Sequence, residues 1–164
     1  MEKEILSWDM FGDATRELAT NIWESGYRPD LIVCVARGGL IPAGAMAYAL
    51  DMKPVLVMNV EFYTKIGETL PDPRLLNPLP DFSALKDSKV LIVDDVVDSG
   101  RTLKYVQELC EANGVGEMRL AVIYEKPTSV LKADYVWRDT DLWITFPWSE
   151  KDPVNAGENY VKVD

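Results

Sequence analysis

The stretch VLIVDDVVDSGRTL, Val90 to Leu103, decides the fold class of this chain. Its first four residues are an apolar run typical of a strand that is buried on both faces of a sheet. The run leads directly into Asp94 and Asp95, and two adjacent carboxylates repel one another unless a cation or hydrogen-bond donors lie beside them. A magnesium ion or the two hydroxyl groups of a diol could be that partner. The stretch therefore predicts a ligand site at the end of a buried strand.

The small-residue turn that follows, Asp98 to Thr102, indicates an anion. It leads into a helix, and the first turn of a helix presents free amides and the positive end of its dipole. Ser99 and Thr102 add hydroxyl donors. An alternative stays open at this point, because Asp at strand ends and Asp or Ser as helix caps are common without any ligand. The Gly-Lys-Ser/Thr ending of a Walker A loop is missing. The whole combination fits a ligand in which a phosphate is joined to a diol.

Composition and charge exclude several classes of function. The chain has 164 residues, enough for one ordinary domain, of which 48% are hydrophobic and 27% charged, as in a globular protein. Its net charge of −10 argues against a nucleic-acid groove. The absence of histidine excludes Ser-His-Asp hydrolysis, Cys-His chemistry and histidine-ligated zinc. Cys34 and Cys110 lack metal or redox spacing, and we predict that both are buried.

Hydrophobic periodicity predicts alternating helices and strands. Helices are predicted over 10–23, 40–50 and 102–113, and strands over 31–36, 54–60, 89–93, 118–124 and 133–137. Residues 64–80 hold four prolines and little periodicity, which predicts a long loop of the kind that often forms a lid. This order predicts an α/β domain with a mostly parallel twisted sheet flanked by helices, in which ligands gather at the C-terminal ends of strands. No apolar run has the length of a signal peptide or membrane helix, so we expect a cytoplasmic protein with no stable membrane anchor.

Several segments together resemble the type I phosphoribosyltransferases. VLIVDDVVDSGRT is similar to the phosphoribosyl pyrophosphate signature of that family. SWDM near the start, VARGGLIPAG, EKP and DLWITFPW resemble the bacterial xanthine-guanine phosphoribosyltransferases, which join a 6-oxopurine to the ribose of the donor with loss of pyrophosphate, using Mg²⁺. The resemblance implies the type I phosphoribosyltransferase fold in a single domain over 1–164. It also implies a flexible lid over about 64–80 and a small C-terminal hood over about 126–150.

The resemblance assigns the donor site to two segments. It implies that Asp94 and Asp95 meet the ribose hydroxyls and the metal, with Asp95 the metal contact. The 5-phosphate would be wrapped by the turn Asp98, Ser99, Gly100, Arg101 and Thr102. Arg37 and Gly38 match the pyrophosphate loop, where glycine lets the backbone approach a dianion and arginine supplies a fork of donors. Family members often have a cis peptide bond before this arginine, which here would be Ala36–Arg37.

The resemblance also assigns the purine site. Lys126 matches the lysine that recognises the 6-oxo group, which favours guanine, xanthine and hypoxanthine over adenine. Trp143 falls where the family stacks an aromatic ring on the base, and Ile144 where backbone groups read the purine 2-position. Asp98 matches the carboxylate near N7, which makes it the candidate catalytic acid-base group. Among the neighbouring tryptophans we assign Trp137 to core packing.

A second hypothesis is a regulator of the same fold that senses the donor and binds RNA or DNA. The net charge of −10, the lack of a helix-turn-helix and the presence of Lys126 and Trp143 argue against it. The family forms dimers and tetramers, so the resemblance implies a homodimer or homotetramer. Tyr63, Lys65 and Arg74 are alternative candidates for lid contacts to pyrophosphate, and the tail after Asp152 has no family feature. No side chain in the sequence indicates which of the three 6-oxopurines is preferred.

Overall fold

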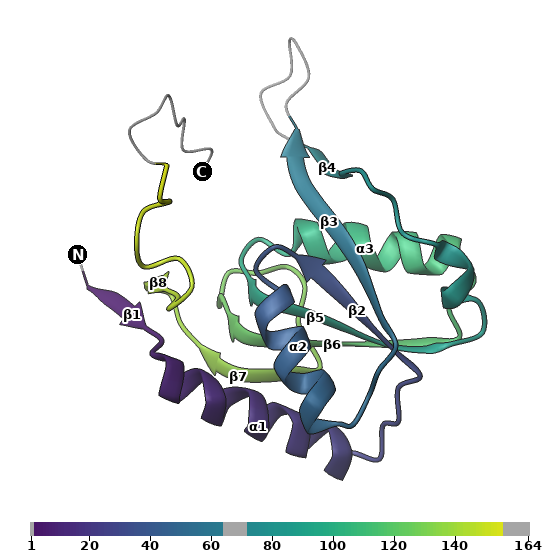
Figure 1. Cartoon of the computed structure of the whole chain (residues 1–164), viewed down its shortest axis with the longest axis horizontal. Helices are drawn as coiled ribbons and strands as arrows, with labels where there is room; N and C mark the ends of the chain where they lie inside the picture. Colours follow the sequence, from purple (N-terminus) through teal and green to yellow (C-terminus); the bar gives the residue numbers. More distant parts are fainter. Residues whose placement is uncertain (1, 64–71, 156–164) are drawn as a thin grey trace.

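The computed structural model describes residues 2–63 and 72–155, which form two sheets and three α-helices (Figure 1). The strands are β1 (Lys3–Ile5), β2 (Leu31–Ala36), β3 (Val55–Tyr63), β4 (Asp72–Leu75), β5 (Lys89–Val97), β6 (Glu117–Glu125), β7 (Tyr135–Asp139) and β8 (Trp143–Thr145). The helices are α1 (Trp8–Glu24), α2 (Leu40–Ala49) and α3 (Arg101–Ala112), with a 3-10 turn over Phe82–Leu85. The large sheet has the order β4-β3-β2-β5-β6-β7, and its strands are parallel except for the β3–β4 pair. The predicted α/β class is confirmed.

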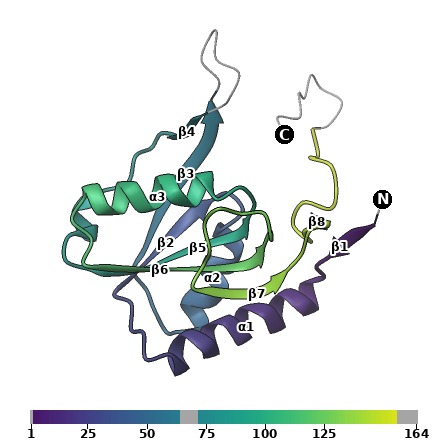
Figure 2. The same cartoon turned by 180° about the vertical axis from the view of Figure 1, so that it is seen from behind.

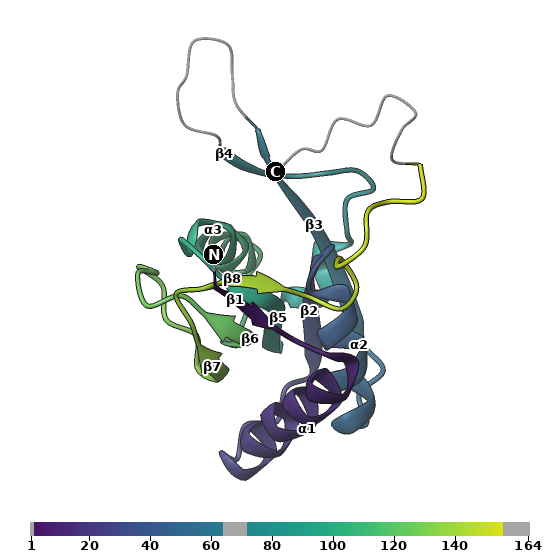
Figure 3. The same ribbon diagram turned by 90° about the vertical axis from the view of Figure 1, so that its left-hand side faces the viewer.

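Two hydrophobic cores lie on opposite faces of the large sheet. Ile32 of β2 and Leu91 of β5 pack with α1 and α2, whereas the next residues, Val33 and Ile92, pack with α3. Figure 3 shows α3 on one side of the strands and α1 and α2 on the other. Side chains alternate along a strand with a period of two, so a strand covered on both faces needs an unbroken apolar run. This accounts for the burial of every residue of β2.

The helix α1 confirms the apolar stripe that predicted it. Its buried face includes Phe11, Ala14, Leu18 and Ile22. The helix begins at Trp8, two residues before the predicted start, because the side chain of Ser7 caps it by accepting a hydrogen bond from the Met10 amide at 3.1 Å. The prediction that Cys34 and Cys110 are buried is also confirmed.

The strand β5 is longer than predicted. Asp94 and Asp95 therefore lie inside its C-terminal part and do not follow it. The reason is the neighbouring strand: β6 continues to pair with β5 as far as Val97, whereas β2 pairs with β5 only as far as Val93. The carboxylates are thus carried on regular strand backbone that has β6 on one side.

Three short strands differ from the sequence analysis. Residues 72–75, which we assign to the long loop, form β4 antiparallel to β3, and Pro73 is tolerated because β4 is an edge strand. Residues 64–71 of the predicted lid lie outside the described residues. The strands β1 and β8 form a separate parallel pair, seen away from the large sheet in Figure 2. Within residues 2–63 and 72–155, no helix is long and apolar enough to cross a membrane.

Candidate active site

A cavity of about 250 Å³ lies where β5 ends and α3 begins. It is lined by residues 94–100 together with Phe62, Thr102 and Leu103. The C-terminal end of a parallel strand that is followed by a helix is the usual place for a ligand in this architecture. The structure thus brings most of the predicted donor-site residues to one cavity.

Asp94 and Asp95 need a positive or hydrogen-bonding partner in this cavity. Asp94 is buried, and its Oδ1 accepts a hydrogen bond from the Asp95 amide at 2.8 Å. Burial raises the pKa of Asp94 well above its usual range, and the nearby Asp95 carboxylate raises it further. Burial also raises the pKa of Asp95. A cation or the hydroxyls of a diol would stabilise the ionised carboxylates and so lower both pKa values.

Gly38 lets the loop after β2 contact Asp95. A Cβ atom added to Gly38 would lie 2.3 Å from Oδ2 of Asp95, closer than any real contact. A Cβ atom on Gly39 would lie 2.4 Å from the Val35 carbonyl oxygen and 2.6 Å from that of Val93. The two glycines are therefore required for close approach, one to a side chain of the site and one to the sheet backbone. The Ala36–Arg37 peptide bond is cis, which confirms that expectation.

The first turn of α3 offers backbone donors to an anion. Gly100 is the N-cap of this helix with φ +90°, a left-handed conformation that favours glycine, and it has no side chain that could occupy the amides of the first turn. Ser99 Oγ accepts a hydrogen bond from the Arg101 amide at 3.3 Å. The positive end of the helix dipole therefore faces the cavity with small residues around it, which suits a phosphate group.

Loop 126–133 supports this turn from behind. A Cβ atom on Gly100 would lie 2.7 Å from Leu131 Cβ and 3.0 Å from Ser129 Oγ, so the loop packs directly against the helix start. The loop itself is fixed by Glu125, which is buried and accepts a hydrogen bond from the Ala133 amide at 2.7 Å. Glu125 is the first residue of the EKP segment, but no role was assigned to it from the sequence, and Ser129 belongs to no motif.

Arg101 extends toward the β3–β4 hairpin. Its guanidinium lies 3.5 Å from Asp72 and 5.4 Å from the centre of the Phe62 ring. Of the residues in the predicted phosphate turn, Arg101 is the one that does not line the cavity. Its side chain links the start of α3 to the hairpin. Phe62 was missed in the sequence because a strand residue that reaches over a neighbouring cavity leaves no local pattern.

Lys126 connects the end of the large sheet to β8. Its amide donates to the Val97 carbonyl at 2.8 Å, at the end of β5. Its ammonium donates to the carbonyl of Leu142, the residue before β8. Lys126 thus lies between the cavity-lining strand and the segment that carries Trp143 and Ile144.

Trp143 and Ile144 lie on the small sheet, in register with Lys3 and Glu4. The Trp143 side chain is 67% exposed, so it contributes little to the core and remains accessible for stacking. Ile144 is half-buried against the core on the α1 side. Trp137 also packs against this core, and its indole N–H donates to Glu17 at 3.0 Å, in agreement with its assignment to packing.

The remaining predicted residues lie at the rim. Asp98 and Arg37 are exposed. Arg37 lines a larger cavity of about 660 Å³, whose walls include the apolar side chains of Leu40, Val55 and Leu79. We assign the site to the smaller cavity, because carboxylates and free amides converge there. Arg74 pairs with Glu61 at 2.9 Å. The other lid candidates cannot be placed, since Lys65 and the Tyr63 side chain lie outside the described residues.

The donor set fits magnesium shared with a substrate. Among residues 2–63 and 72–155, no three Cys, Asp or Glu side chains gather into a complete metal cage. Asp94 and Asp95 offer two carboxylates on adjacent residues. Mg²⁺ is commonly held by one or two carboxylates, with water and substrate phosphates as its other ligands. The site therefore suits a metal that arrives with a phosphorylated ligand.

Known proteins resemble this chain over nearly all of its length. The phosphoribosyl transferase domain family matches residues 1–154. Proteins named xanthine-guanine phosphoribosyltransferase from Ruegeria sp. and Idiomarina loihiensis are each 33% identical, over 87% of this chain and 83% and 84% of their own lengths. The crystal structure of the purine phosphoribosyltransferase from Pyrococcus horikoshii matches with a TM-score of 0.80 and 40% identity, over 94% of this chain and 97% of that one. This chain therefore belongs to the phosphoribosyltransferase family.

Proposed function

We propose that this protein is a purine salvage enzyme that transfers the phosphoribosyl group of phosphoribosyl pyrophosphate to N9 of a 6-oxopurine: guanine, xanthine or hypoxanthine. The products are the nucleoside 5′-monophosphate and pyrophosphate. The observation that carries the proposal is the cavity between β5 and α3, where two carboxylates and the free amides of a helix start lie side by side. The names of the relatives in Ruegeria and Idiomarina support the same class of substrate.

The donor would lie along β5 and the turn after it. Its ribose hydroxyls would donate to Asp94 and Asp95, and its 5-phosphate would accept from the amides and hydroxyls of residues 98–102. Its pyrophosphate would meet Arg37 and the backbone at Gly38, which directly contacts Asp95. Most of the catalytic effect would then come from holding the donor in one orientation and from matching its charge.

We also propose that the reaction depends on Mg²⁺. Asp95, together with Asp94, would hold the ion. When bound, Mg²⁺ neutralises charge on the leaving pyrophosphate. A lid over about residues 64–80 would exclude the water that otherwise hydrolyses the donor.

The acceptor would lie between Lys126 and Trp143. The ammonium of Lys126 would donate to the 6-oxo group, whereas the 6-amino group of adenine would face it donor to donor. Trp143 would stack on the ring, and backbone groups at Ile144 would meet the 2-position. As N9 bonds to C1 of the ribose and the bond from C1 to pyrophosphate breaks, the base loses its N7 proton, which Asp98 would accept.

Turnover with a panel of bases tests this proposal. The protein is mixed with phosphoribosyl pyrophosphate, Mg²⁺ and one of guanine, xanthine, hypoxanthine or adenine, and nucleotide is measured by chromatography. We expect nucleotide with at least one 6-oxopurine and little with adenine. Tight donor binding without turnover on any base would instead support the regulator. A cytoplasmic location stays a prediction from the sequence. A homodimer or homotetramer stays a prediction from the family, and sedimentation tests it.

A further inference from the structure

The small sheet that carries Trp143 has few contacts of its own. It consists of β1 and β8, with three residue pairs and one further backbone hydrogen bond, from the Leu6 amide to the Thr145 carbonyl at 3.0 Å. A two-stranded sheet of this size is marginally stable by itself in water. Trp143 is largely exposed and adds little packing. The position of β8 must therefore be fixed by contacts to the rest of the molecule.

One such contact is made by the carboxylate of Glu4, in the middle of β1. Its Oε1 accepts a hydrogen bond from the hydroxyl of Tyr124 at 3.1 Å and lies 3.7 Å from the Arg138 guanidinium. Arg138 is itself placed over the ring of Trp137, 3.9 Å from its centre. The Glu4 side chain is only 24% exposed, so the carboxylate exchanges part of its hydration for these partners. A hydrogen bond to a charged acceptor is among the stronger ones in proteins.

Tyr124 places this contact next to the purine site. The residue is fully buried near the end of β6, two positions before Lys126, which follows the strand, and its ring lies edge-on to Phe146 at 6.1 Å and to Trp137 at 5.7 Å. Glu4 is directly opposite Ile144 in the β1–β8 pair. The end of β6 thus holds both strands of the small sheet: Tyr124 holds β1 through Glu4, and Lys126 holds β8 through the Leu142 carbonyl.

We propose that Glu4 is a positioning residue for purine recognition, which acts through its hydrogen bond to Tyr124 and so fixes β8 at a set distance from Lys126. The inference rests on the proposed function, because it assumes that Trp143 and Ile144 meet the base. Lys126 is expected to turn toward the purine oxygen, whereas Glu4 and Tyr124 touch no substrate. The contact between Glu4 and Tyr124 therefore remains when the base binds, and it fixes the position of the Trp143 ring before binding.

The test is Tyr124→Phe, which removes the hydroxyl and keeps the ring. We expect the KM for guanine to rise about tenfold, since a hydrogen bond to a charged group is lost, while kcat and the KM for phosphoribosyl pyrophosphate change less than about twofold. The Glu4→Ala variant should raise this KM at least as much, because it also removes the ion pair with Arg138. The double variant should be no worse than Glu4→Ala alone, because Glu4→Ala already removes the hydrogen bond that Tyr124→Phe removes.

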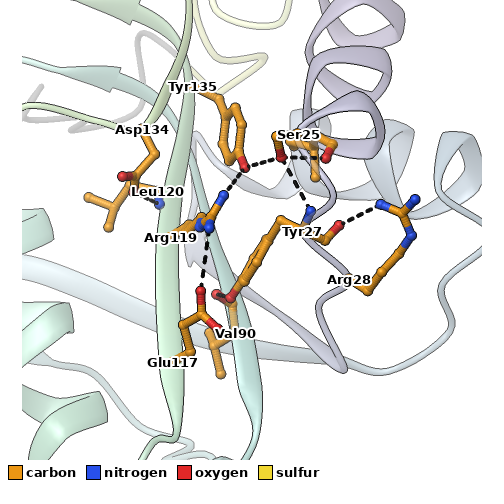
Figure 4. A network of polar contacts seen from close by, with 10 residues as sticks. Ser25, Tyr27, Arg28, Val90, Glu117, Arg119, Leu120, Asp134 and Tyr135 are labelled. Carbon is orange, nitrogen blue, oxygen red and sulfur yellow. Dashed lines mark hydrogen bonds and ion pairs between the residues drawn. The ribbon is translucent and has the colours of Figure 1, made fainter.

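Tyr27→Phe is the matched control. The Tyr27 hydroxyl is likewise buried and donates to the Val90 carbonyl at 2.7 Å, in the polar network at the other end of the sheet (Figure 4). Removing it should lower the unfolding temperature and leave the KM for guanine unchanged. An equal rise of that KM in Tyr27→Phe would overturn the proposal, because lost stability alone would then explain the effect.

A second readout does not depend on catalysis. Hydrogen exchange of the free protein should be faster at residues 143–145 in Tyr124→Phe than in the wild type, with exchange in α1 unchanged. Unchanged exchange there, together with an unchanged KM, would refute the role of Glu4. If the wild type transfers nothing to any purine, the proposed function fails, and faster exchange at 143–145 would still support the Glu4–Tyr124 link.

Discussion

The substitution Gly38→Ala tests the contact between the loop after β2 and the carboxylates of β5. The added methyl group would lie 2.3 Å from Oδ2 of Asp95, 2.6 Å from its Cγ and 2.8 Å from Oδ1. Gly38 does not have a positive φ, so alanine fits its backbone conformation. The cost is therefore a steric one and falls on the Asp95 side chain.

The size of the effect follows from this geometry. Ordinary van der Waals contact begins at 3.4 Å, so the Asp95 carboxylate must move by about 1 Å. A misplacement of about 1 Å at a reacting centre costs on the order of 100-fold in rate. We expect kcat/KM for phosphoribosyl pyrophosphate to fall by a factor on the order of 100, with a cooperative unfolding transition retained. Gly39→Ala should instead destabilise the fold, because its methyl group would meet the carbonyls of Val35 and Val93.

Initial rates of nucleotide formation measure the effect, with thermal unfolding recorded on the same samples. Gly44→Ala is the control, since it lies within α2 and a Cβ there meets nothing within 4 Å. Alanine in place of glycine in a helix stabilises it by about 1 kcal/mol, so Gly44→Ala should raise Tm by about 2–4 °C and leave the rate unchanged. A folded Gly38→Ala variant with wild-type kcat/KM would show that the position of Asp95 is irrelevant to the reaction.

Three further outcomes follow from the site and the core. Asp98→Asn should lower kcat by a factor on the order of 100 with little change in donor affinity, and an unchanged kcat would reduce Asp98 to a helix-cap role. Trp143→Ala should raise the KM for guanine about fivefold without affecting the donor, because stacking contributes about 1 kcal/mol, whereas equal loss of both would indicate packing. Burial raises the pKa of Cys34 to about 12 and that of Cys110 to about 11, so little thiolate forms at pH 8. A thiol reagent should label both cysteines only after denaturation, and rapid labelling of the native protein would contradict their burial.

The large sheet was predictable because its central strands are covered on both faces. Burial on two sides requires unbroken apolar runs, and these runs at 31–36 and 89–93 are visible without any structure. The strands β1 and β8 were not predictable, because each has three residues and they pair across most of the chain. Over so short a length no period can be recognised. The strand β4 was missed because Pro73 and the prolines that follow the strand argue for a loop, although an edge strand tolerates a proline.

The candidate site was predictable where its residues are contiguous. Residues 94–102 form one continuous segment, so the strand, the turn and the helix start can be recognised together. The sequence assigns no role to the groups that support the site from other elements, such as Glu125 next to the turn and Glu4 on β1 beside β8. Their roles depend on contacts between distant parts of the chain. The sequence indicates that Gly38 allows a close approach of the backbone. That the close neighbour is Asp95 is visible only in the structure.

The most direct test of phosphoribosyl transfer at this site is a crystal structure of the protein with GMP bound. We expect the phosphate at the amides of residues 98–102, the ribose hydroxyls at Asp94 and Asp95, and the purine between Lys126 and Trp143 with its 6-oxo group toward the ammonium. Nucleotide bound elsewhere, or with its phosphate away from the start of α3, would contradict the assignment of the site.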